Sequence, residues 1–158
     1  MRRLVWLLGC VAFPSTLGLA ADTWTGCYQR VFDANALKNA PRLQLRVLGV
    51  QILAKDSDLS LTTYPAKVRA APRTGTKTYL GEAVCISTGG TLRCQLDNGD
   101  GELLLTRTAE GLKVENGEQF YLHEQGGTGE VEVKGDRDNR SFSLPSASAA
   151  VCTGPLPR

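Results

Sequence analysis

Few side chains in this sequence are arranged in a pattern that is typical of catalysis. His123 is the only histidine, so a serine–histidine–aspartate mechanism would have to pass through it. The sequence has no Gly-x-Ser-x-Gly motif, which presents the nucleophile in one large class of hydrolases. It also lacks the second histidine of an ordinary zinc site. We therefore interpret His123 as a structural residue of a strand, beside Tyr121 and Glu124.

Two acidic clusters have the composition of a calcium site but not its spacing. They are Asp97, Asp100 and Glu102, and Asp136, Asp138 and Asn139. Neither follows the spacing of an EF-hand loop, so we interpret both as solvated hairpin tips. A carboxylate pair for glycoside hydrolysis can be distant in sequence, and nothing singles one out here. The sequence predicts no catalytic residue, no metal and no cofactor.

The cysteines predict disulfides, because four of the five lie beyond a predicted export signal and their number is even. The pair Gly89-Gly90 is typical of a two-residue type I′ hairpin turn. Folding there places Cys85 opposite Cys94 in a non-hydrogen-bonded pair, with Cα atoms about 4.5 Å apart, where a bridge fits. A redox Cys-x-x-Cys motif and close-spaced zinc ligands are both absent from the sequence. By elimination, Cys27 pairs with Cys152.

Export is predicted from the first twenty residues. Arg2 and Arg3 precede a short uncharged apolar run, and small residues at positions 18 and 20 suit cleavage after Ala20. This pattern is typical of a secretory signal peptide, and the run is too short to span a membrane. We therefore expect residues 1–20 to be removed and residues 21–158 to form one domain in the periplasm or outside the cell.

The charge balance argues against nucleic acid and against a polybasic membrane-surface protein. The chain has 18 basic and 16 acidic residues, and loss of Arg2 and Arg3 leaves 16 of each. The distribution is uneven: positions 21–79 hold nine basic and four acidic residues, and positions 80–158 hold seven and twelve. We expect no nucleic-acid partner.

Turn signals divide the chain into short strands. A second two-residue turn at Asn98-Gly99 pairs Cys94 with Leu103, and it agrees with the first hairpin on which residues share one face. That predicted inner face consists of Ala83, Cys85, Leu92, Cys94, Leu96, Leu103 and Leu105. Further turns are predicted at Glu110-Gly111, Asn116-Gly117, 126–129 and 135–139.

Upstream, strands are predicted at 24–32 and 43–53, and the apolar phase of the second flips beside Gly49, which indicates a β-bulge. A similar flip occurs within 59–68. Later strands are predicted at 78–86, around 131–133 and around 142–144. The spacing and the first-to-last disulfide predict an all-β fold, an antiparallel up-and-down barrel of about eight to ten strands, with a β-sandwich as the alternative. Residues 33–41 predict a short helix, either a connector or a lid at the barrel mouth.

Two resemblances accompany this pattern. The stretch CYQRVFDANALKNAP, followed by RLQLRVLGVQIL, resembles the start of small exported bacterial proteins of unknown function. The predicted architecture is similar to the calycin-like group, which comprises lipocalins, avidins and periplasmic inhibitor barrels. Lipocalins carry Gly-x-Trp in the first strand, whereas this chain has Trp24-Thr25-Gly26, the reverse order. The second resemblance therefore implies a barrel and transfers no binding residue.

Two sets of residues are candidates for binding. The first set shares one face of the first strand and could line a ligand cavity, with the arginine as polar anchor: Trp24, Tyr28, Arg30 and Phe32. The second set brackets a turn and could bind an anionic partner: Lys67, Arg69, Arg73 and Lys77. Both sets also have a plain structural interpretation, as core and as solvated loop.

Three functional hypotheses remain. The first is a non-catalytic binding module that recognises a protein or cell-envelope component through its loops, an inhibitor of a secreted hydrolase being one version. The second is a carrier of a small apolar ligand in the barrel interior. The third is a carboxylate-dependent hydrolase. The lack of catalytic motifs favours the first, and the sequence names neither the partner nor the oligomeric state.

Overall fold

A computed structural model describes residues 24–55 and 62–157. The predicted signal peptide and the first part of the predicted phase flip at 59–68 lie outside the described residues. The strands are β1 (Gly26–Val31), β2 (Leu45–Ile52), β3 (Thr63–Pro72), β4 (Tyr79–Thr88), β5 (Thr91–Leu96), β6 (Gly101–Arg107), β7 (Gly111–Glu124), β8 (Glu130–Lys134) and β9 (Ser141–Ala147). The helices are α1 (Ala34–Asn39) and α2 (Ala149–Thr153), with 3₁₀ turns η1 (Asp97–Gly99) and η2 (Arg137–Asn139).

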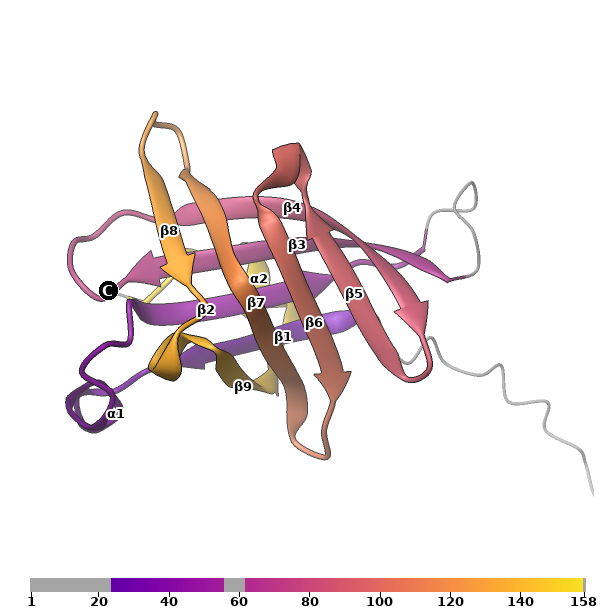
Figure 1. The fold of residues 1–158 in the computed structure, drawn as a ribbon, viewed down its shortest axis with the longest axis horizontal. Coiled ribbons are helices and arrows are strands. Elements are labelled where there is room, and N and C mark those ends of the chain that lie inside the picture. The colour runs from indigo at the N-terminus through magenta and orange to yellow at the C-terminus, as the bar shows by residue number, and fades with distance from the viewer. Residues whose placement is uncertain (1–23, 56–61, 158) are drawn as a thin grey trace, which may run out of the picture.

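The strands form a closed antiparallel barrel (Figure 1). Strands β1 to β7 follow one another as a meander, and β9 closes the ring between β7 and β1. The ring therefore has eight strands, and β8 lies outside it, paired with the second half of β7. This confirms the predicted all-β barrel.

The wall formed by β4, β5 and β6 has the predicted register. Cys85 pairs with Cys94, and Cys94 pairs with Leu103. Gly89 and Gly90 both have positive φ, and so do Asn98 and Gly99, as type I′ turns require. All seven residues of the predicted inner face are at most 4% exposed. The Cys85–Cys94 disulfide is present, with Cα atoms 3.9 Å apart.

The predicted turn at Asn116-Gly117 is wrong, because β7 runs through it. Gly101 pairs with Phe120 whereas Leu103 pairs with Asn116, so residues 117–119 bulge out of the strand. Asn116 is only 2% exposed, and its backbone N–H donates to the carbonyl of Arg140. The bulge lies where β7 exchanges β9 for β8 as its neighbour. The asparagine–glycine pair therefore bends the strand here and does not end it.

The bulge predicted beside Gly49 also lies elsewhere. The register of β2 against β3 shifts between Leu45 and Val47. Gly49 pairs regularly with Gln29, and a Cβ atom there would lie 3.3 Å from the Gln29 Oε1 atom. Glycine at this position therefore accommodates a neighbouring side chain. After the bulge, Val47 packs against Leu156 outside the main core cluster.

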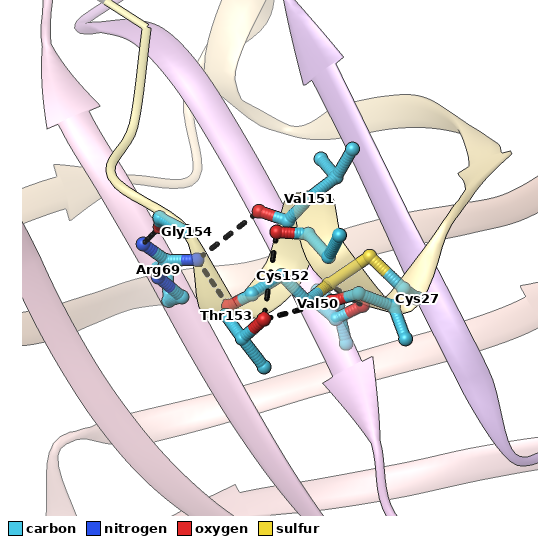
Figure 2. Close-up of a disulfide and its surroundings, with 9 residues drawn as sticks. Cys27, Val50, Arg69, Val151, Cys152, Thr153 and Gly154 are labelled. Atoms are coloured by element: carbon cyan, nitrogen blue, oxygen red, sulfur yellow. Dashed lines mark hydrogen bonds between the residues drawn. A yellow bond between two sulfur atoms is a disulfide. The ribbon is translucent and has the colours of Figure 1, made fainter.

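The C-terminal segment crosses the outside of the barrel over β1 to β3 (Figure 2). The predicted Cys27–Cys152 disulfide is present and ties α2 to β1, with Cα atoms 5.9 Å apart. Arg69 of β3 donates to the carbonyls of Val151 and Cys152 in α2 and to that of Gly154, the residue that follows α2 (Figure 2). Burial lowers the pKa of Arg69. The disulfide and the arginine together hold this segment on the barrel.

The predicted helix is α1, at one end of β1 and β2 (Figure 1). Asp33 caps it, because its Oδ1 atom accepts a hydrogen bond from the backbone N–H of Ala36 at 2.8 Å. Ala36, Leu37 and Ala40 pack against the core cluster. The helix thus covers the barrel side chains near the end of β1.

Carboxamide side chains close the gap between β8 and the start of β2. Gln44 donates to the Glu132 carbonyl at 3.1 Å and accepts from the Lys134 N–H at 2.9 Å. The Asn139 side chain accepts from the Gln44 N–H at 2.9 Å and donates to the Arg42 carbonyl at 3.0 Å. Each of these side-chain amides bonds two backbone groups. They therefore replace the backbone hydrogen bonds that a neighbouring strand would supply.

Candidate functional site

The β1–β9 seam is the weakest ladder in the ring. The two strands pair only at Cys27 with Ala147 and at Tyr28 with Ser146. Continuing this register would place Gln29 opposite Pro145, which has no N–H to donate. Beyond that point β1 pairs only with β2, and β9 pairs only with β7. A single proline therefore ends the ladder and leaves two strand edges facing one another.

The open part of the seam forms a groove with two hollows, which we call the β1–β9 groove. The larger has a volume of about 700 Å³ and is lined by Gln29, Arg30, Val31, Thr108, Ala109, Glu110, Ser143, Leu144 and Pro145. The smaller has a volume of about 300 Å³ and lies against α1, lined by Arg30, Phe32, Ala36, Ala40, Leu43, Asp138, Ser141, Phe142 and Ser143. Both hollows include Arg30 and Ser143, so the groove is continuous from the 108–110 loop to α1.

Arg30 stands at the junction of the two hollows. Its guanidinium lies 5.2 Å from the centre of the Phe32 ring, which in turn meets the Phe142 ring edge-on at 6.2 Å. It donates one long hydrogen bond, 3.4 Å, across the seam to the carbonyl of Ser143. Arginine offers five N–H groups in a flat fork, which suits a carboxylate or a backbone carbonyl. The geometry thus presents a stacked, oriented cation in the middle of the groove.

The four residues of the predicted ligand-binding set have different positions. Trp24 and Tyr28 are buried in the core cluster, and the Arg107 guanidinium lies 5.8 Å and 5.7 Å from their ring centres. Phe32 and Arg30 line the groove. Phe32 is only 7% exposed and belongs to the same core cluster as Trp24 and Tyr28, so Arg30 is the one residue of the set that is not buried. Their role in binding a ligand stays a prediction.

The predicted basic set is spread over several intramolecular contacts. Lys67 lies 3.6 Å from a Glu82 oxygen, and Arg69 holds α2 as described. Arg73 donates to the carbonyls of Ala40 and Pro41, which follow α1. Lys77 lies 2.8 Å from Glu124 Oε2, and this hydrogen bond raises the pKa of Lys77 and lowers that of Glu124. The role of these cations in binding an anionic partner stays a prediction.

The outer face of β7 and β8 carries a polar cluster around His123. The His123 side chain is 51% exposed, and its Nε2 atom lies 2.7 Å from Asp100 Oδ2. Tyr121 donates to Glu132 at 3.3 Å; desolvation and this carboxylate raise the pKa of Tyr121. Across residues 24–55 and 62–157, no group of three or more histidines, cysteines or carboxylates is arranged to hold a metal ion. The cluster is a surface network that joins β7 and β8 to Asp100 of the β5–β6 turn.

Comparison of the chain with known protein families, with curated proteins and with solved structures gives no match. Within the described ranges, none of the helices is both long and apolar enough to cross a membrane.

Sequence reasoning missed the groove residues Val31, Ser143 and Pro145. The proline was the available signal, because a proline inside an otherwise alternating strand marks a place where a ladder is interrupted. The sequence does not show which ladder the proline interrupts, because that depends on the pairing of β1 with β9.

Proposed function

We propose that the chain is a non-catalytic binding module whose partner occupies the β1–β9 groove. One observation carries the proposal: a cluster of buried side chains packs the barrel interior, whereas the groove is a surface hollow with Arg30 beside the strand edges where the β1–β9 pairing has ended. Binding sites in proteins are typically concave, with a few convergent polar groups on an apolar lining. The groove has this composition, with Arg30 between Phe32, Val31 and Pro145.

The proposed place of action is the periplasm or the cell exterior. Two disulfides support a non-reducing compartment, and the pattern of residues 1–20 supports secretion. An inhibitor of a secreted hydrolase is one version of this function, and it requires no catalytic residue of its own.

The experiment compares two exposed valines on different strands of the barrel. Val31 lies in the groove and is 48% exposed, and Val84 of β4 is 49% exposed. A photo-crosslinking amino acid replaces each in turn, and the purified proteins are irradiated with the envelope fraction of the producing cell. We expect a discrete adduct from position 31 and none from position 84. Identical adducts from both positions, or no adduct from position 31, would contradict the proposal.

A second candidate function is a carrier of a small apolar ligand, favoured by the hollow beneath α1. Phe32, Phe142 and Leu43 supply an apolar lining, and Arg30 supplies a polar anchor. Native mass spectrometry of the mature protein, purified from its own envelope without detergent, tests this function. A discrete small adduct that is lost in Phe142→Ala would support the carrier; a bare protein mass would count against it.

A further inference from the structure

We propose that the occupant of the groove is an extended polypeptide segment that adds to the open edge of β1 as a new strand. This inference rests on the proposed function and specifies the chemistry of the partner. Addition of a strand to a sheet edge obtains affinity from backbone hydrogen bonds and specificity from alternate side chains. The groove supplies both requirements.

The backbone of Val31 points into the groove. Phe32 donates its N–H to the Arg46 carbonyl of β2 at 2.9 Å, so Phe32 and Arg46 form a hydrogen-bonded pair. In an antiparallel ladder such pairs alternate with non-hydrogen-bonded ones, and Val31 is paired with Val47 in the intervening position. The N–H and C=O of Val31 are therefore directed away from β2, toward β9, at the level where the β1–β9 ladder has already ended.

The facing edge of β9 is open in the same way. The backbone N–H of Asn116 donates to the Arg140 carbonyl, and the backbone N–H of Ser146 donates to the Glu110 carbonyl. These two bonds show which residue pairs between β7 and β9 are hydrogen-bonded. By the same alternation, the backbone groups of Ser143 point toward β1. The contact that bridges the gap there is the long hydrogen bond from Arg30 to the Ser143 carbonyl. A strand bound to the β1 edge would replace this single side-chain contact.

The side chains around this edge indicate what the segment carries. Arg30 is the cation at the centre, and Glu110 and Asp138 lie toward opposite ends of the groove. A segment with an acidic residue opposite Arg30 would match the central charge, because a guanidinium binds a carboxylate through paired hydrogen bonds. Val31 and Pro145 offer apolar contact to the residues that alternate with the acid.

The open edge of β8 makes a poorer site of this kind. Gln44 already bonds the Glu132 carbonyl and the Lys134 N–H at that edge. Charged side chains, Glu130, Glu132 and Lys134, alternate along the strand, which is a common protection of an edge against pairing. The two edges thus differ: β8 is covered, and β1 is not.

The test uses a phage-displayed library of random twelve-residue peptides, selected on the folded mature protein. Affinities of the selected peptides are then compared for Val31→Pro, which removes the N–H, and Val31→Thr, which keeps the N–H and a side chain of similar shape. Proline is tolerated at an edge whose N–H does not pair within the sheet. We expect peptides with alternating apolar residues and one acid at a fixed position. Val31→Pro should weaken them about tenfold, whereas Val31→Thr should change affinity about twofold or less.

A second measurement does not depend on folding of the proline variant. Amide hydrogen exchange at Val31 and Ser143 in the unmodified protein should slow when a selected peptide is added. If Ala109→Trp, which fills the groove, abolishes binding while Val31→Pro equals Val31→Thr and exchange is unchanged, strand addition is wrong and groove binding stands. If neither the Trp nor the Pro substitution changes the affinity, the peptides bind elsewhere and both proposals fail.

Discussion

The wall formed by β4, β5 and β6 and the seam between β1 and β9 are built on opposite principles. In the wall, two tight turns set a continuous ladder, and the residues on its inner face are buried. In the seam, two residue pairs are followed by a proline, and the remaining contact is a side-chain hydrogen bond. The barrel is therefore closed by local hairpins along one side and by contacts between distant parts of the sequence along the other.

The largest expected effect comes from removing the disulfide that ties α2, which follows β9, to β1 at the seam. The Cys27–Cys152 disulfide has a sequence separation of 125, and the Cys85–Cys94 disulfide has a separation of 9. In the chain-entropy model, Cys27→Ala with Cys152→Ala should lower the free energy of unfolding by about 4–5 kcal/mol, and Cys85→Ala with Cys94→Ala by about 3 kcal/mol. Guanidinium unfolding measures both double variants. A larger loss from the hairpin bridge would contradict the view that the seam depends on its disulfide.

The next largest effect on stability distinguishes the packed wall from the open groove. Leu103→Ala removes a fully buried side chain of β6 and should cost about 2–5 kcal/mol, because it leaves a cavity. Val31→Ala in the groove is the matched control and should change stability by no more than about 0.5 kcal/mol. Thermal and denaturant unfolding provide the comparison. Similar losses at both positions would mean that the groove is part of the packed core.

A smaller effect tests the amides that close the gap beside β8. Asn139→Ala leaves the Gln44 N–H and the Arg42 carbonyl without their side-chain partner and should cost about 1–3 kcal/mol. Asn39→Ala, at the exposed end of α1, is the control and should change stability by at most about 0.5 kcal/mol. The unfolding midpoints of the two variants measure this difference in stability. Equal stability of both would show that the buried amide contributes nothing to closure.

The smallest effect depends on pH. The hydrogen bond from Lys77 lowers the pKa of Glu124 in the folded state, so this pair stabilises the fold above the ordinary glutamate pKa of about 4.3 and ceases to do so as pH falls through the lowered value. Lys77 is 61% exposed in its side chain, so salt should screen the effect. Acid titration of wild type against Lys77→Met measures the difference, which should vanish at low pH. A difference that grows on acidification would contradict the pairing.

Sequence reasoning was strongest where structure is local. The pairs Gly89-Gly90 and Asn98-Gly99 each determine a register within about ten residues, and the register of Cys85, Cys94 and Leu103 was therefore predictable. The same reasoning was wrong at Asn116-Gly117, because the local signal for a turn is also compatible with a bulge. What decides between them is the change of partner from β9 to β8, which only the tertiary structure supplies.

The candidate site was less predictable for the same physical reason. Arg30 and Phe32 belong to the set predicted on one face of the first strand, but the groove depends on Pro145, which the β1–β9 register would place opposite Gln29, more than a hundred residues away in sequence. The contacts of Gln44 with β8 and with Asn139 likewise join segments about ninety residues apart. No turn signal or period in the sequence reports such long-range amide contacts.

The measurement that tests the open seam most directly is native-state amide hydrogen exchange within β1. The Phe32 N–H donates to the Arg46 carbonyl, whereas the Val31 N–H is directed into the groove. We expect slow exchange at Phe32 and much faster exchange at its neighbour Val31, with the same contrast between Phe142 and Ser143 in β9. Equal protection of Val31 and Phe32 would mean that the two strands are paired along their length, and the groove could then not be the binding site.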